Sequence, residues 1–177
     1  MNIRETTNLD IEDILLVERA AFKREGEAML TRNLLVDPTA KPILSLLAYN
    51  ETQPIGHILF TKATIITAPH IKASMLAPLA VVPQYQKQGV GSALIKKGLQ
   101  LQSQSGIELV FVLGHIEYYP KYGFTPAAKL GFEPTYPIPN EVADAWMVQA
   151  LKPGIIGAVS GKVMGCDAMN RPENWRE

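Results

Sequence analysis

The sequence contains little cysteine, no excess of either charge and no long apolar run. Cys166 is its one cysteine, which excludes an intrachain disulfide and a cysteine-based metal framework. Lys plus Arg and Asp plus Glu each number 17, so the formal net charge is zero, which argues against a nucleic-acid binder that relies on bulk positive charge. No apolar run approaches the roughly 20 residues of a membrane helix, and Met1–Glu5 lacks the apolar region of a signal peptide. We therefore expect a cytoplasmic protein without a membrane or nucleic-acid partner.

A metal-ligand pattern is missing as well. The His, Asp and Glu residues show no His-x-x-x-His or similar helical spacing, so we expect no metal site. What the chain does have is apolar side chains, because 47% of its 177 residues are hydrophobic. That fraction is enough to build the core of one domain.

The apolar periodicity alternates along the chain between that of a helix and that of a strand. Helices are predicted over residues 10–22 and 27–35, and a third opens at Gly89–Gly91 and ends at Ser105–Gly106. Short apolar runs predict strands over residues 1–4, 43–49, 55–61, 75–82, 109–113, 145–151 and 156–164. Pro78 cannot donate to a ladder, so we expect a bulge or an edge position there. Strand, helix and strand between residues 75 and 113 make a parallel crossover, which predicts an α/β fold with a mixed sheet.

The stretch from Leu79 to Leu94 carries the clearest chemical signal. An apolar strand leads into a loop rich in hydrogen-bond donors, and Gly89 and Gly91 open the next helix. The first turn of a helix has unpaired N–H groups and partial positive charge, so the loop suits a phosphate or diphosphate. The P-loop pattern is absent, and the dinucleotide pattern Gly-x-Gly-x-x-Gly lacks its third glycine. A dinucleotide site and an ordinary helix start without a ligand stay open as alternatives.

Residues Val82–Leu94 resemble the acetyl-CoA-binding signature of the GNAT superfamily of N-acetyltransferases. Gln86, Gly89 and Gly91 match its Gln/Arg-x-x-Gly-x-Gly/Ala loop, and Tyr119–Phe124 matches its Tyr-x-x-x-Gly-Phe segment. Within the superfamily the chain is similar to a bacterial subgroup of predicted acetyltransferases. The resemblance implies a twisted mixed sheet flanked by helices over residues 1–152, with residues 153–177 as an extension packed on the same domain.

The resemblance also implies the cosubstrate, acetyl-CoA or coenzyme A. It would enter where strands 79–81 and 109–113 separate. The strand backbone would bind the pantetheine arm, and the loop would wrap the diphosphate. The residues expected to bind it are Leu79, Ala80, Val81, Gln86, Lys87, Gln88, Gly89, Val90, Gly91 and Ser92.

The reaction implied is direct transfer of an acetyl group to a primary amine in a ternary complex. The developing oxyanion needs hydrogen-bond donors, for which the backbone of residues 79–81 is the natural source, and the leaving thiolate needs an acid. Tyr119 occupies the position of the family's usual acid. Tyr122, or no acid at all, is the alternative.

The base that deprotonates the amine is harder to place. The family's usual acidic residue is missing from strand 74–82. His115 follows a buried strand at its C-terminal end, where such folds place ligands, and it is the candidate that we select. His57, Glu117 and a route through water without a dedicated base stay open.

The remaining features favour structural roles. Cys166 is expected to be a buried small residue rather than a nucleophile, and Trp146 and Trp175 to anchor the core or the tail. Loops 23–27 and 67–74 are expected to shape the site of the acceptor, a small-molecule or peptide amine. Homodimers are common in the family, which allows one here. The rival functions are a non-catalytic sensor of coenzyme A or a nucleotide, and an NAD-binding protein.

Overall fold

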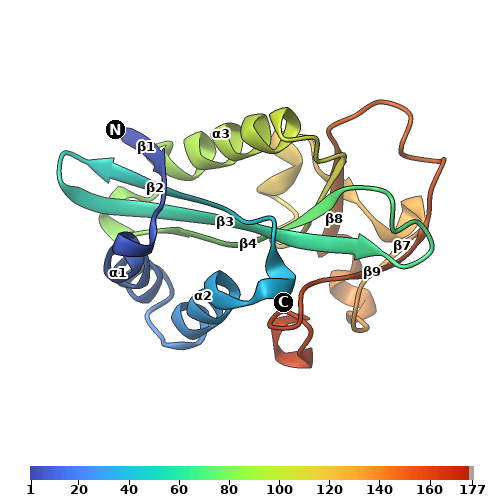
Figure 1. The fold of residues 1–177 in the computed structure, drawn as a ribbon, viewed down its shortest axis with the longest axis horizontal. Helices are drawn as coiled ribbons and strands as arrows, with labels where there is room; N and C mark the ends of the chain where they lie inside the picture. The colour runs from blue at the N-terminus through green and yellow to red at the C-terminus, as the bar shows by residue number, and fades with distance from the viewer. Residues whose placement is uncertain (176–177) are drawn as a thin grey trace.

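The computed structural model describes residues 1–175, which form an open sheet covered by helices on both faces (Figure 1). Helices α1 (Ile11–Phe22) and α2 (Gly26–Val36) lie on one face, and α3 (Val90–Gln104) lies on the other. The main sheet runs in the order β1 (Asn2–Glu5), β2 (Leu44–Asn50), β3 (Gln53–Ile65), β4 (Ala73–Val81), β5 (Leu109–Leu113), β8 (Trp146–Ala150) and β6 (Thr125–Pro126). The short strands β7 (Phe132–Glu133) and β9 (Gly161–Met164) pair with each other, and β9 also pairs with β3.

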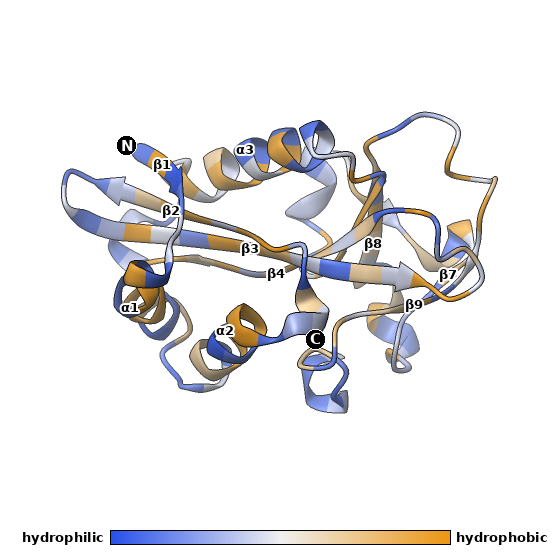
Figure 2. Cartoon of the chain, in the orientation of Figure 1, coloured by the Kyte–Doolittle hydropathy of each residue, from blue (hydrophilic) through white to orange (hydrophobic). Residues whose placement is uncertain are grey.

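Both strand directions occur in this sheet. Neighbouring strands of the main sheet are antiparallel, except for β4 and β5, which are parallel and joined by α3. The predicted α/β class and mixed sheet are therefore confirmed. Figure 2 shows the long central strands rich in hydrophobic residues, whereas the turn between β2 and β3 is hydrophilic.

Local sequence explains where the helices begin, end and pack. The Thr7 side chain and Asp10 form a capping box just before α1, and Lys23 in the left-handed conformation ends that helix. On the other face, Gly98 of α3 lets the helix lie directly on the Phe60 ring of β3, because any side chain at Gly98 would overlap that ring. Glycine at this position therefore sets how closely α3 approaches the sheet. No helix within residues 1–175 has both the length and the apolar character needed to cross a membrane.

The structure modifies the predicted elements in three places. β3 reaches Ile65 because its last residues pair with β9, beyond the range predicted. The strand predicted over residues 156–164 is confined to Gly161–Met164. The register of β3 and β4 shifts opposite Pro78, so the predicted bulge is confirmed.

The C-terminal segment packs beside α2. Asp37 and Thr39, which follow α2, accept hydrogen bonds of 2.9 Å from the backbone N–H groups of Ala168 and Asp167. Trp175 is buried against Trp146 with ring centroids 5.4 Å apart, so both tryptophans are anchors of the core, as predicted. The division between a domain at 1–152 and an extension at 153–177 stays a prediction.

Candidate active site

Strands β4 and β5 lie side by side for only part of their length. Their parallel register consists of three residue pairs and ends at Met75↔Phe111. β4 continues to Val81, whereas β5 ends at Leu113, where it pairs on its other side with Trp146 of β8. In the described sheet, the β4 edge from residue 76 to residue 81 therefore faces β5 without pairing to it. Those of its backbone N–H and C=O groups that point away from β3 can serve another partner.

The loop after β4, residues 86–92, is the one that the sequence predicts to bind the cosubstrate, and it is called the cofactor loop below. Gly89 has φ +88° and caps α3, and Lys87 also has a positive φ of +60°. The N–H of Ala93 makes the first bond of the helix, to the carbonyl of Gly89 at 3.0 Å. The N–H groups of residues 90–92 come before that bond and belong to the unsatisfied first turn.

Glutamine side chains hold the cofactor loop in place. Gln86 donates from its side-chain amide to the carbonyl oxygen of Val81 at 2.9 Å, and Gln88 donates to that of Gln84 at 2.8 Å. No heavy atom outside the neighbouring residues lies within 4 Å of the position that a side chain at Gly89 would take. The space beside Gly89 is therefore open at the start of α3, where unpaired N–H groups suit an anion.

Two tyrosines, Tyr118 and Tyr122, lie next to this loop. A Cβ atom at Gly91 would come 2.5 Å from the Tyr118 hydroxyl, so Tyr118 reaches the first turn of α3. Tyr122 packs edge-on against Tyr118, with ring centroids 5.2 Å apart, and lies near Ser92. Burial raises the pKa of Tyr118, and Tyr122 adds to the effect. Burial also acts to raise the pKa of Tyr122, but hydrogen bonds from Ser92 and Tyr118 and the nearby lysines outweigh it, so the pKa is lowered.

Tyr119 has a different environment. Its ring is buried against Phe124, with centroids 5.8 Å apart, and closely covers Gly114, where a side chain would overlap it. It belongs to the same hydrophobic cluster as Leu79 and Val81 at the open edge of β4. Tyr118 and Tyr122 belong to that cluster as well, so cluster membership does not single out Tyr119.

His115 lies beyond the end of β5, at the rim of a cavity of about 580 Å³. One wall of the cavity is the segment 115–118, and the other is the 3₁₀ helix η6 (Asn140–Ala145). Tyr118 lines the cavity and also touches the first turn of α3. The predicted base and the cofactor loop therefore lie on either side of one tyrosine.

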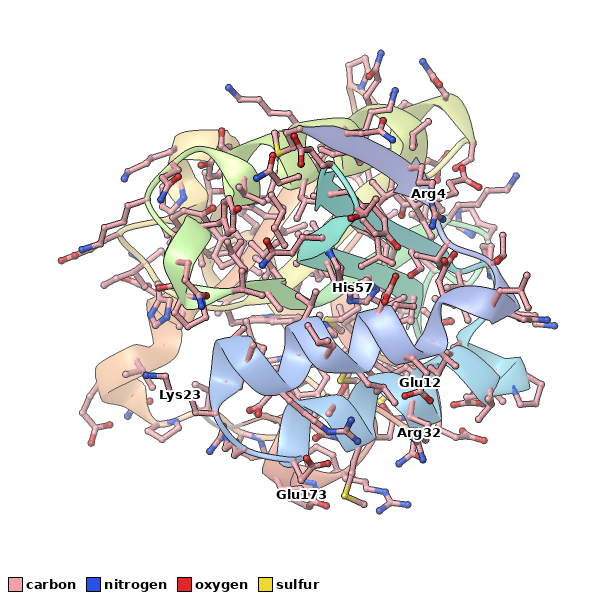
Figure 3. The ribbon with its side chains drawn as sticks, turned by 90° about the vertical axis from the view of Figure 1, so that its left-hand side faces the viewer. Arg4, Glu12, Lys23, Arg32, His57 and Glu173 are labelled. Carbon is pink, nitrogen blue, oxygen red and sulfur yellow. The ribbon has the colours of Figure 1, made fainter. Side chains whose placement is uncertain are left out.

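His57 is completely buried between α1 and the sheet (Figure 3). Its Nε2 is 2.9 Å from the Ser45 hydroxyl, and its Nδ1 is 3.5 Å from Glu18 Oε1. Burial raises the pKa of Glu18, and the neighbouring His57 opposes that shift. These contacts favour the structural interpretation of His57.

Other predicted features are placed away from the cofactor loop. The loop before β4 lies at the opposite end of that nine-residue strand, where Thr67 hydrogen-bonds Ser160, so it is too far away to line the cavity at residues 115–118. Cys166 is buried, and burial raises the pKa of its thiol to about 11, which makes it a poor nucleophile at neutral pH. Within residues 1–175, no group of three or more His, Cys, Asp or Glu residues could hold a metal ion.

Sequence reasoning missed two features of this region. Glu18 stands four residues after Ile14, on the apolar face of α1, and a charged residue there was a signal of a buried partner. The cavity wall at η6 had no such signal, because residues 140–145 show neither helical nor strand periodicity.

Comparison with known proteins agrees with this geometry. The model of the acetyltransferase (GNAT) domain matches residues 43–126. The Escherichia coli K12 protein described as uncharacterized N-acetyltransferase YjhQ is 47% identical over 150 residues, which are 82% of each chain.

Two solved structures extend the likeness over nearly the whole chain. The E. coli GNAT family N-acetyltransferase YhbS in complex with CoA has a TM-score of 0.87 at 28% identity, covering 97% of this chain and 92% of that one. A GNAT family acetyltransferase from Brucella melitensis in complex with acetyl-CoA has a TM-score of 0.76 at 26% identity, covering 95% and 97%. The fold, the open β4 edge, the cofactor loop and these relatives together show that the chain belongs to the GNAT family of N-acetyltransferases.

Proposed function

We propose that this protein transfers the acetyl group of acetyl-CoA directly to a primary amine, with both substrates bound at once. The observation that carries the proposal is the loss of β4–β5 pairing after Met75, immediately before a cofactor loop with unpaired N–H groups. The relatives with bound CoA and acetyl-CoA support the choice of cosubstrate.

Backbone groups would hold most of the cosubstrate. Acetyl-CoA supplies a thioester at the end of an amide-containing arm, with a diphosphate farther along. The N–H groups of Val90, Gly91 and Ser92 would donate to the diphosphate, helped by the dipole of α3. The unpaired edge of Leu79–Val81 would pair with the amides of the arm, and its N–H groups would stabilise charge on the thioester oxygen.

Side chains would donate and accept the protons that the reaction transfers. Tyr119 would donate a proton to the departing thiolate; an ordinary phenol has a pKa of about 10 and a thiol about 8.5, so the transfer costs little. His115 would accept the proton of the amine, because a neutral imidazole nitrogen can act as a general base. Cys166 is buried with a raised pKa, so the chain's one thiol is a poor acyl carrier, which supports direct transfer.

Ligand-dependent thermal unfolding tests the proposal first. Ligands that bind only the folded state raise its melting temperature. We expect acetyl-CoA and coenzyme A to raise the melting temperature and NAD to leave it unchanged. Gly91→Glu should abolish the rise, since it places a carboxylate against the Tyr118 hydroxyl and the diphosphate position.

A matched control uses the same substitution at another helix start. Gly26 opens α2 and has no heavy atom near its would-be Cβ, so Gly26→Glu should leave the coenzyme A response intact. If millimolar acetyl-CoA does not change the melting temperature, the proposal is wrong. Stabilisation without thiol release for any amine in a panel would favour the rival function, a sensor.

The cytoplasmic location and the homodimer expected from the sequence stay predictions. Cell fractionation and sedimentation velocity test them.

A further inference from the structure

The cavity beside the cofactor loop has the position expected for the second substrate. It lies at the C-terminal end of β5, between residues 115–118 and η6, and has a volume of about 580 Å³. η6 leads into β8, which borders β5 on the side away from β4. The cavity and the open β4 edge therefore flank the same strand end, with Tyr118 between the cavity and Gly91.

The charge of the cavity wall is unbalanced. Three carboxylates line it, from Glu117, Glu141 and Asp144, against the single ammonium of Lys121. Asp144 also lies 3.6 Å from Lys129, but both side chains are more than half exposed, so this ion pair contributes little. Ile116 and Val142 add apolar surface between the charged groups.

From this combination we infer that the acceptor is a small amine with a second positive charge, separated from the reacting nitrogen by an alkyl chain. The inference rests on the proposed acetyl transfer and names its substrate class. The carboxylates of Glu117 and Glu141 hold the distal ammonium, and the apolar wall contacts the chain. The reacting nitrogen is then free to lose its proton near His115, because the charge that anchors the acceptor is on the other end.

Three amines of matched length test the inference. They are 1,4-diaminobutane, n-butylamine and 4-aminobutanoate, which differ in the charge at the distal end. With acetyl-CoA saturating, we expect kcat/KM for the diamine to exceed that for n-butylamine by at least about fivefold, the upper range for one exposed ion pair. 4-Aminobutanoate should be the poorest substrate of the three, and added salt should reduce the differences in kcat/KM.

Charge-neutral variants then locate the effect. Glu117→Gln and Glu141→Gln should each raise KM for the diamine by about threefold to fivefold and leave KM for n-butylamine unchanged. Glu12→Gln is the matched control, since Glu12 is an exposed carboxylate on α1 outside the cavity wall. Glu12→Gln should change neither KM for the diamine nor KM for n-butylamine.

Failure of the inference and failure of acetyl transfer give different results. Turnover of all three amines at equal kcat/KM, or faster turnover of 4-aminobutanoate, overturns the inference while acetyl transfer stands. If no amine releases thiol, the proposed acetyl transfer fails. Calorimetric titration of 1,4-diaminobutane and n-butylamine into the coenzyme A complex then tests whether the cavity prefers a diamine. If the two amines bind equally or not at all, the inference is overturned. If the diamine binds more tightly and Glu141→Gln weakens its binding, the inference is supported.

Discussion

Three neighbouring tyrosines show how strongly the surroundings of a single residue determine its role. Tyr118 reaches the helix start at Gly91, Tyr122 packs edge-on against Tyr118, and Tyr119 is the buried member of the three, packed on Phe124 and Gly114. The lowered pKa of Tyr122 makes its proton easier to lose, and its neighbours Ser92 and Lys96 belong to α3. The match of Tyr119 to the family's Tyr-x-x-x-Gly-Phe segment is the ground on which we propose it as the acid.

Removing the Tyr119 hydroxyl should slow turnover without weakening cosubstrate binding. We expect Tyr119→Phe to lower kcat by about 100-fold, the range for loss of one general acid, with the coenzyme A dissociation constant within twofold of the wild type. Steady-state kinetics and calorimetry measure the two effects.

Two further substitutions interpret the result. Tyr136→Phe removes a phenol that hydrogen-bonds the carbonyl of Asn170, away from the cavity, and should keep full kcat. A larger loss of kcat in Tyr122→Phe than in Tyr119→Phe would show that Tyr122 is the acid.

At the scale of elements, buried polar groups join α1 and α2 to the sheet. Glu18 of α1 faces His57 of β3, which contacts Ser45 of β2, and the Thr31 hydroxyl of α2 lies 3.4 Å from Glu18. Glu18 Oε2 and His57 Nδ1 are buried without a hydrogen-bond partner within residues 1–175. A buried group in this condition is costly when ionised.

The raised pKa of Glu18 predicts the sign of a pH effect on stability. A carboxyl group with a raised folded-state pKa stabilises fully below its unfolded pKa of about 4.3, and this contribution is lost as pH rises through the folded value. The free energy of unfolding of the wild type should therefore fall relative to Glu18→Gln between pH 4.5 and 8. Urea denaturation at several pH values measures the difference.

Glu12→Gln on the exposed face of the same helix serves as the control and should show no such trend. The opposite sign, with the wild type gaining stability over Glu18→Gln as pH rises, would show that His57 keeps Glu18 ionised.

Elements with strong periodicity were predictable from the sequence, and those without it were not. The helix predicted over residues 10–22 is found at Ile11–Phe22, and the buried strand 109–113 is found as predicted. Residues 114–145 form 3₁₀ turns and two-residue strands that leave no periodic pattern. The predicted loop residues at Gly89 and Gly91 lie where the motif indicated, but the contact of Tyr118 with Gly91 depends on tertiary packing, which one sequence does not show.

At the scale of the molecule, the core consists of two clusters, which at β5 and β8 lie on opposite faces of the sheet. One contains α3, the open part of β4 and Tyr119. The other contains the start of β4, β8 and the C-terminal segment with Trp175. Damage to the second cluster should therefore affect stability more than ligand binding.

Trp175→Ala tests this separation. Loss of a buried tryptophan side chain should lower the free energy of unfolding by about 3 kcal/mol. The coenzyme A dissociation constant, measured well below the melting temperature, should stay within twofold of the wild type.

Leu9→Ala provides the comparison, because Leu9 is 93% exposed. Its effect on unfolding should be below about 0.5 kcal/mol. A coenzyme A affinity that falls together with stability in Trp175→Ala would show that the two clusters act as one.

The early end of the β4–β5 pairing has a consequence for how such an enzyme diverges. The opening presents main-chain groups, which every amino acid except proline supplies in full. On the proposed function, substitutions of Leu79 and Val81 that keep their apolar packing can therefore accumulate while the cosubstrate is still accommodated. The cavity wall uses carboxylates, and a single codon change alters each of them. Use of the same acetyl donor should therefore persist among related sequences, whereas the proposed acceptor preference can change through substitutions in the cavity wall.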